Sequence, residues 1–308
     1  MLEDNHRYLS SLDELGYLPM SSKTEQIIYD EAKKSVEQLG ESASKVLLDH
    51  ICSINGLSEK ELLTNYDLFE KLLHRVLKEG ADIILQNIKR KLLVHAVLID
   101  PNITIRDIRN PRLTVDDILK RLRAVETLEF VRKIPSHEHI AFLYRDENSK
   151  DAMLAAFFDT KIIGKTSMGL FSTKRPANQL SHVNNIMLYQ DLLQEPPQEY
   201  EVVARKVADW TTKLHSLNKP HKNNTECPTR IAGEDAMWWF RNGFASYILG
   251  IEKSMGRYLQ ENMSVLCGYN ISNGSNENID NEEINSLIAA HSYVIIDEPF
   301  TVYTSANA

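Results

Sequence analysis

The sequence predicts an α/β fold, a mainly parallel sheet covered by helices and preceded by a small all-α domain. Up to His95, apolar residues recur at helical spacing, with no strand-like alternation between them. From His137 onward, short apolar runs alternate with helical segments long enough to cross from one parallel strand to the next. The parts we expect are an N-terminal tail (1–22), a helical domain (23–98), a basic linker with one helix (99–136) and an α/β domain (137–308).

Composition limits the class of protein. The 308 residues are 43% hydrophobic and 25% charged, enough to bury the cores of two domains. The formal net charge of -8 argues against a protein that coats nucleic acid, so any DNA contact would be local. The acidic N-terminus has no apolar signal segment, and no run approaches the roughly 20 apolar residues of a membrane span. We therefore expect a cytoplasmic protein without membrane contact.

The helical domain carries clear start and stop signals. Ser58 followed by Glu61 is typical of a capping box that opens a helix. Gly56 and Gly80 lie where the preceding helices should end. Three or four short helices around one small core are the natural arrangement.

The linker is punctuated by prolines and is locally basic. Its helix begins at Thr114, whose hydroxyl can cap the turn that holds Asp116 and Asp117. The basic residues are Arg106, Arg109, Arg112, Lys120, Arg121, Arg123, Arg132 and Lys133. A solvated linker helix is the preferred interpretation, and an arm that binds DNA or a protein partner is the alternative.

The α/β domain contains five predicted strands: 139–146, 167–173, 229–234, 263–270 and 292–299. Helices are expected over 149–159, 187–193, 199–217, 238–259 and 282–291. Ligands of such sheets bind at the carboxyl ends of strands. That rule points to Tyr144, Arg145, Gly233, Glu234, Tyr269, Asn270, Asp297 and Glu298.

Two fragments imitate a nucleotide site. Gly164-Lys165-Thr166 has the ending of a P-loop, but the loop's first glycine is missing. A helix precedes it where a strand is needed, and a strand follows where a helix is needed. The run that ends in Asp297-Glu298 resembles a magnesium-binding strand, yet without a P-loop it is half a site.

Metal, cofactor and catalytic signals are weak. His137 and His139 could share one side of a strand start, and His215, His221 and Cys227 lie loosely within one segment. Neither spacing is diagnostic. The three cysteines, Cys52, Cys227 and Cys267, form no CxxC pair. The sequence also lacks the Gly-x-Ser-x-Gly motif of a nucleophile elbow. We expect no metal, no cofactor and no enzymatic activity.

An aromatic group follows the predicted strand end at Gly233-Glu234. Its members are Trp238, Trp239, Phe240, Phe244 and Tyr247. Such a cluster is commonly core between a helix and a sheet, but its place at a strand end also suits the wall of a small-molecule pocket.

Several motifs occur in a recognisable order. They are His139-Ile-Ala-Phe-Leu-Tyr144, Arg230-Ile-Ala-Gly-Glu234 with Trp238, Ile251-Glu252, Val265-Leu-Cys-Gly-Tyr269, and His291 before the strand from Tyr293 to Asp297. Together they resemble the MEDS family of methanogen and methylotroph sensory domains over nearly all of 137–303. The resemblance implies a RecA/KaiC-like sheet that has lost its P-loop, and a sensory role proposed for hydrocarbon derivatives. The ligand-binding residues we expect are His139, Tyr144, Glu234, Trp238, Glu252, Tyr269, His291 and Asp297.

Two departures from the MEDS pattern concern segment 161–185 and Gly268, which replaces a more polar residue common before the tyrosine. The ligand's identity is therefore not transferable. Residues 39–88 are similar to the NitrOD family of archaeal helical output domains.

These observations favour a signal-transduction protein. Its α/β domain would sense a small molecule, a hydrocarbon derivative or a nucleotide, and its helical domain would signal to a protein partner through a conformational change of the linker helix. One alternative is a degenerate nucleotide-binding enzyme using Lys165, Asp297 and Glu298. Another is a DNA-binding transcriptional regulator that uses Arg121 and Arg123 in the linker. The sequence leaves a homo-oligomer open.

Overall fold

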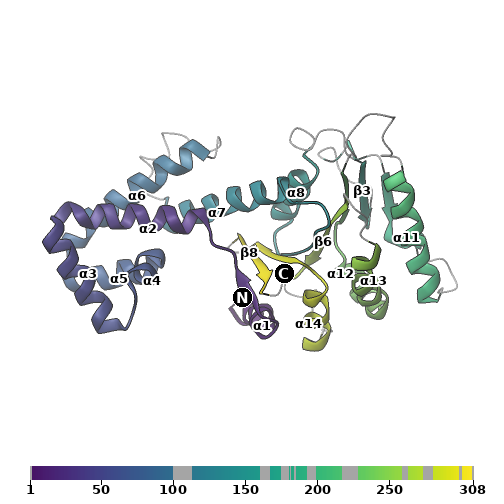
Figure 1. Ribbon diagram of the computed structural model, residues 1–308, viewed down its shortest axis with the longest axis horizontal. Helices are drawn as coiled ribbons and strands as arrows, with labels where there is room; N and C mark the ends of the chain where they lie inside the picture. The colour runs from purple at the N-terminus through teal and green to yellow at the C-terminus, as the bar shows by residue number, and fades with distance from the viewer. Residues whose placement is uncertain are drawn as a thin grey trace. The chain divides into compact units, whose positions relative to one another are not determined.

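The computed structural model describes most of the chain and divides it into two compact units. The described residues are 2–99, 113–159, 167–174, 180, 182–183, 185–192, 199–216, 228–258, 263–272, 280–297 and 300–306. The α/β unit combines Met1–Met20 with Thr127–Ala308, and the helical unit is Ser21–Glu126. Figure 1 shows the helices and strands of both units.

The helical unit packs its helices around one apolar core that includes the fully buried Ile28, Leu62 and Phe69. The helices are α2 (Lys23–Val36), η1 (Glu37–Leu39), α3 (Glu41–Asn55), α4 (Glu59–Thr64), α5 (Tyr66–Leu77), α6 (Gly80–Ile99) and the first part of α7 (Val115–Arg132). A core made by amphipathic faces stabilises helices too short to persist alone.

The helix ends test the predicted capping signals. The Ser58–Glu61 capping box is confirmed, and Gly56 ends α3 with a left-handed φ of 65°. Thr114 opens α7, because its hydroxyl accepts the amide of Asp117 at 3.1 Å. The expected helix stop at Gly80 is wrong: α5 ends at Leu77, Lys78 takes the positive φ, and Gly80 begins α6.

The α/β unit is built on one eight-stranded sheet in the order β1-β8-β7-β2-β6-β5-β3-β4. The strands are β1 (Tyr17–Pro19), β2 (His139–Tyr144), β3 (Ser167–Ser172), β4 (Asn185–Leu188), β5 (Thr229–Gly233), β6 (Met263–Asn270), β7 (Tyr293–Asp297) and β8 (Phe300–Ser305). The six strands from β7 to β4 pair in parallel, while β8 and β1 continue the sheet antiparallel. The prediction of a mainly parallel α/β sheet is confirmed.

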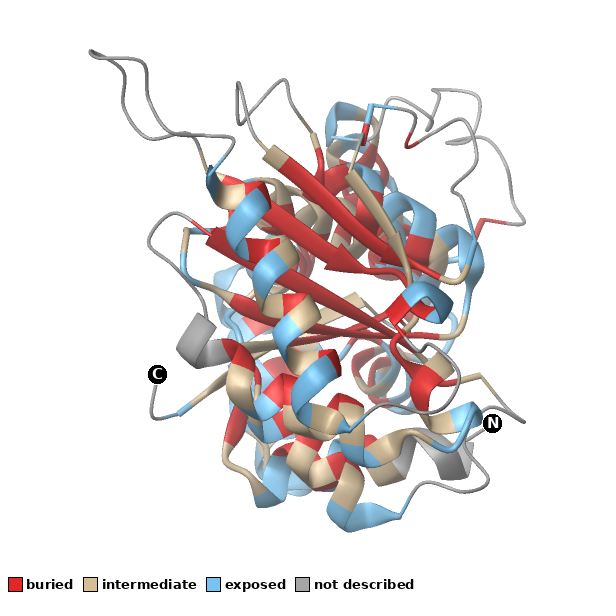
Figure 2. Ribbon diagram, turned by 90° about the vertical axis from the view of Figure 1, so that its right-hand side faces the viewer, coloured by how far each residue is buried: buried red, intermediate tan, exposed pale blue. Residues whose placement is uncertain are grey.

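Helices cover both faces of this sheet. They are α1 (Leu2–Glu14), α8 (Glu147–Phe157), α10 (Tyr189–Leu192), α11 (Tyr200–Ser216), α12 (Met237–Arg241), α13 (Ala245–Tyr258) and α14 (Asn281–Ala289). Alternation along β2 divides the core: Ala141 and Leu143 pack with α1 and α10 to α14, whereas Ile140 and Phe142 pack with α8 and the end of α7. Figure 2 shows the central strands buried among the helices.

Some elements differ from the sequence prediction. The residues expected as a tail form α1 and β1, and β1 pairs with β8. The predicted helix over 187–193 is wrong at its start, because Met187 and Leu188 belong to β4 and α10 begins at Tyr189. No described helix combines the length and apolarity required to cross a membrane.

Candidate functional site

The predicted strand-end residues Tyr144, Glu234 and Asp297 are held by other groups of the protein. The Tyr144 hydroxyl donates to the Glu234 carbonyl at 3.2 Å, and Lys150 Nζ lies 3.0 Å from Glu234 Oε1. Asp297 Oδ2 accepts the amides of Arg145 at 2.7 Å and Asp146 at 3.1 Å. These contacts stabilise the turn between β2 and α8, so the three side chains have a structural role at the strand ends.

The predicted pocket residue Trp238 is half-buried and stacks on Tyr189, with ring centroids 5.6 Å apart. Its neighbour Trp239 is almost fully buried and lines a cavity beneath the helices. The aromatic group is therefore mainly core, and Trp239 rather than Trp238 reaches the hollow inside it.

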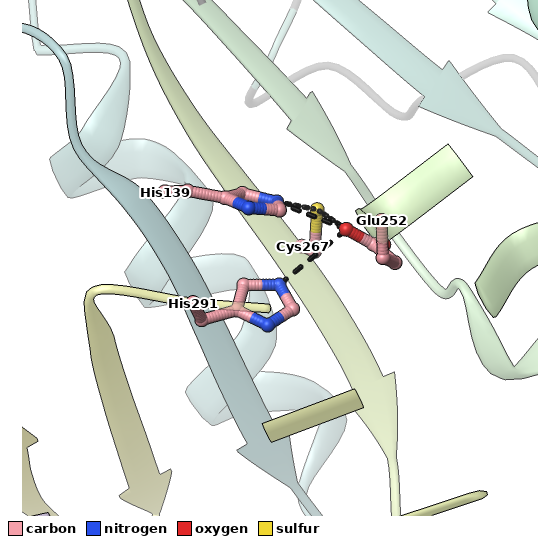
Figure 3. Close-up of side chains that lie close together, drawn as sticks. All are labelled: His139, Glu252, Cys267 and His291. Carbon is pink, nitrogen blue, oxygen red and sulfur yellow. Dashed lines mark hydrogen bonds and ion pairs between the residues drawn. The ribbon is translucent and has the colours of Figure 1, made fainter. Parts of the chain in front are cut away.

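A separate polar cluster lies inside the apolar core on one face of the sheet. It contains His139 at the start of β2, Glu252 on α13, Cys267 and Tyr269 on β6, and His291 between α14 and β7. Each of these side chains is at least nine-tenths buried. Figure 3 shows four of them converging from these separate elements.

The distances within the cluster are short. His139 Nε2 lies 2.9 Å from Glu252 Oε2 and 3.4 Å from Cys267 Sγ. His291 Nε2 lies 3.5 Å from the same Glu252 oxygen. The Tyr269 hydroxyl donates to the other carboxylate oxygen, Glu252 Oε1, at 2.6 Å. Two imidazoles and a thiol thus surround one carboxylate oxygen.

Backbone carbonyls orient both imidazole rings. His139 Nδ1 lies 2.9 Å from the carbonyl oxygen of Ala290, and His291 Nδ1 lies 2.7 Å from that of Leu287. Because a carbonyl only accepts, each Nδ1 must carry the hydrogen. Both Nε2 atoms therefore turn toward the cluster.

The surroundings fix most of the charges in this cluster. Burial would raise the pKa of Glu252, but the contacts with His139, His291 and Tyr269 outweigh it and lower that pKa to about 2. Burial, and to a lesser degree the neighbouring His139, lowers the pKa of His291 to about 3. Burial also raises the pKa of the Cys267 thiol and of the Tyr269 phenol well above their usual values. At neutral pH the carboxylate is ionised, His291 is neutral, and the thiol and phenol keep their protons.

An apolar cavity of about 40 Å³ adjoins the cluster between the sheet and helices α10 to α13. Its lining includes Phe171, Trp239 and Ile248, and it shares Glu252 and Cys267 with the cluster. Tyr189 also lines it, and the buried hydroxyl of this residue has no hydrogen-bond partner among the described residues. The cavity is thus an apolar hollow with polar groups in its wall.

The structure brings together four of the eight predicted ligand-binding residues: His139, Glu252, Tyr269 and His291. Tyr144 and Glu234 meet at the strand ends instead. Sequence reasoning missed Cys267 and Tyr189 as site residues. Alternation along a strand could have found Cys267, since it lies two residues before Tyr269 and must share its face.

The other candidates from the sequence either lie away from the polar cluster or fall outside the described residues. His137 lies outside the cluster, and His215 Nδ1 lies 3.2 Å from Thr229 Oγ1. Several candidates lie outside the described residues: the P-loop-like segment Gly164-Lys165-Thr166, the metal candidates His221 and Cys227, Glu298, and the linker residues Arg106, Arg109 and Arg112.

No protein-family model matches the chain, and the search of curated proteins finds no significant match.

Proposed function

We propose that this chain is a signal-transduction protein whose α/β unit binds a small, largely apolar molecule in the cavity beside Tyr189. The buried hydroxyl of Tyr189, which has no hydrogen-bond partner among the described residues, is the observation that carries the proposal. A buried donor without an acceptor is costly, and native proteins rarely keep one without a bound water or ligand. A ligand with one acceptor atom on an apolar body would satisfy it.

The size of the cavity favours one of the two ligand classes that the sequence suggested. One water needs roughly 10–15 Å³ of such space. At about 40 Å³, the cavity holds a molecule of only a few non-hydrogen atoms. A mononucleotide is far larger and highly charged, whereas a short hydrocarbon derivative suits both the volume and the lining. The resemblance to the MEDS family, with its RecA/KaiC-like fold, agrees with this choice.

Two helices are suitable elements to carry the signal. Helix α13 contributes Ile248 and Glu252 to the cavity wall, so a ligand there contacts this helix directly. Helix α7 gives Ile118 to the core of the helical unit and Val131 to the core of the α/β unit. For signalling, the ligand must bind two conformations with different affinity, and a helix shared by two cores is a suitable element to change.

The test is binding of short alcohols, ketones and haloalkanes to the full chain, measured by calorimetry and by thermal shift, with mononucleotides beside them. We expect saturable binding of at least one hydrocarbon derivative and none of the nucleotides. Tyr189→Phe should weaken the binding of ligands that carry an acceptor, without loss of stability, since removing an unpaired buried hydroxyl is neutral or favourable. Ile248→Phe should abolish binding by filling the cavity.

The matched control is Tyr293→Phe, because Tyr293 packs on the other face of the sheet. This variant should bind as the wild type does. Absence of binding by the wild type across the panel, or equal binding by Ile248→Phe, would contradict the proposal.

A further inference from the structure

The four side chains His139, Glu252, Cys267 and His291 present one metal-ligating atom each, and these atoms all lie within 4.8 Å of one another. We infer that they hold one divalent transition-metal ion of the zinc type, bound through the two Nε2 atoms, the Glu252 carboxylate and the Cys267 thiolate. The inference does not depend on the proposed function, because it rests on the donor atoms alone.

The donor set and three of its separations match such an ion. Imidazole nitrogen, carboxylate oxygen and thiolate sulfur are the ligands of tetrahedral zinc, with bonds of about 2.0–2.3 Å. Such bonds place neighbouring ligand atoms roughly 3.2–3.8 Å apart. The separations of 3.4 Å between His139 Nε2 and Cys267 Sγ and 3.7 Å between Cys267 Sγ and Glu252 Oε2 lie in this range. His291 Nε2, at 3.5 Å from the same oxygen, also does.

The outer contacts are those that metal sites require. A ligating histidine almost always donates its other ring nitrogen to a carbonyl or carboxylate, and here both Nδ1 atoms face backbone carbonyls. The Tyr269 hydroxyl holds Glu252 Oε1, which leaves Oε2 directed at the two imidazoles. The metal's ligands are thus oriented from outside by other groups.

The contact between His139 Nε2 and Glu252 Oε2 is compatible with a bound cation. At 2.9 Å, two atoms that both carry lone pairs need a proton or a cation between them. Metal binding would displace to solvent both the proton between these two atoms and the Cys267 thiol proton, so two negative ligands, two neutral imidazoles and one dication leave the site neutral. Neutrality suits a site buried in an apolar core.

The experiment is a cobalt(II) titration of the full chain after metal removal with a chelator. We expect one cobalt per chain, with the visible bands of tetrahedral cobalt and a near-ultraviolet thiolate-to-cobalt charge-transfer band. Cys267→Ser should lose the charge-transfer band and weaken binding by at least about tenfold. Cys52→Ser, in α3 of the helical unit, is the matched control and should retain both.

X-ray absorption on the zinc-loaded wild type decides the matter even if Cys267→Ser fails to fold. The inference expects one sulfur at about 2.3 Å and three nitrogen or oxygen neighbours near 2.0–2.1 Å. Failure of the wild type to bind cobalt stoichiometrically, a charge-transfer band that persists in Cys267→Ser, or a zinc shell without sulfur would overturn it. Metal binding without binding of any hydrocarbon derivative would leave this site standing and remove the proposed function.

Discussion

Gly268 lies where β6 passes closest to the chain that leaves β5. A Cβ atom built on Gly268 would stand 2.6 Å from the carbonyl oxygen of Glu234 and 3.0 Å from that of Gly233. Both neighbours are backbone and cannot turn aside as a flexible side chain can. A side chain at this position would therefore collide with the backbone after β5, where the Glu234 carboxylate meets Lys150.

Replacing Gly268 with alanine should destabilise the α/β unit by about 1–3 kcal/mol, because the turn after β5 would have to move away from the new methyl group. Urea unfolding followed by tryptophan fluorescence measures this loss. Gly80→Ala is the control, since a Cβ at Gly80 meets only an ordinary contact at 3.8 Å, and circular dichroism follows its unfolding because Gly80 lies in the helical unit. Equal stability of Gly268→Ala and the wild type would show that the turn yields without cost.

The grouping of the polar cluster could not be predicted from local sequence spacing. His139, Glu252, Cys267 and His291 are separated by up to 152 positions, as the difference between 291 and 139 gives, so no local spacing marks them as ligands. The ordered motifs of the MEDS resemblance pointed to three of them. Cys267 stood within one of those motifs but has no cysteine partner nearby, so counting cysteines gave no metal signal.

At the scale of elements, fully buried strands were predictable, and the partly buried or short strands toward the two ends of the sheet were not. β2 and β6 are apolar along nearly their whole length because both faces are covered, and such runs stand out in a sequence. β4 and β8 are only partly buried throughout, and β1 has three residues. β1 also pairs with β8 at the far end of the chain, a contact that β propensity does not encode.

The carboxylate of Glu126, on α7, caps the N-terminus of helix α2. Sequence spacing could not reveal this contact between two helices. Glu126 accepts the amides of Lys23 at 2.6 Å and Thr24 at 3.1 Å, and the hydroxyls of Ser22 and Thr24 at 2.6 and 2.8 Å. A carboxylate is favoured at a helix N-terminus, where amides lack partners and the dipole is positive. Partial burial acts to raise the pKa of Glu126, but these hydrogen bonds outweigh it and lower that pKa.

Glu126→Gln should therefore destabilise the helical unit by about 1 kcal/mol at neutral pH, the usual cost of a lost helix cap. Because the folded state lowers the pKa of Glu126, its contribution is complete above the ordinary value of 4.5 and is lost as the pH falls through the folded value. The gap between variant and wild type should shrink on acidification. Urea unfolding followed by far-ultraviolet circular dichroism at several pH values measures it.

The exposed Glu79 provides the control for this pH series, since Glu79→Gln removes one charge from the same unit at a solvent-exposed position. It should leave the unfolding free energy nearly unchanged at every pH. A gap between Glu126→Gln and the wild type that widens on acidification would contradict the capping role.

At the scale of the whole molecule, the boundaries of the two compact units differ from the domain boundaries that the sequence pattern predicts. The pattern change near His137 correctly marks where the parallel strands of the sheet begin, since β2 starts at His139. The α/β unit nevertheless includes Met1–Met20 and the end of α7. A three-residue strand at one end of the chain that pairs with β8 at the other leaves no local signal.

Separate cores predict separate responses to core mutations. All three tryptophans, Trp210, Trp238 and Trp239, belong to the α/β unit, so tryptophan fluorescence follows that unit, whereas circular dichroism follows the helices of both. Phe69→Ala, in the helical core, should cost about 3–5 kcal/mol and shift the circular dichroism transition while the fluorescence transition stays in place.

Phe142→Ala is the counterpart, since Phe142 is equally buried but lies in the α/β core on β2. It should shift the fluorescence transition by a similar free energy, because each substitution removes one ring from a packed interior. Urea titrations of both variants, monitored by the two signals on the same samples, make the comparison. If Phe69→Ala moved the fluorescence transition by the same amount as the circular dichroism transition, the two cores would unfold as one cooperative unit, and the division into independently stabilised units would be wrong.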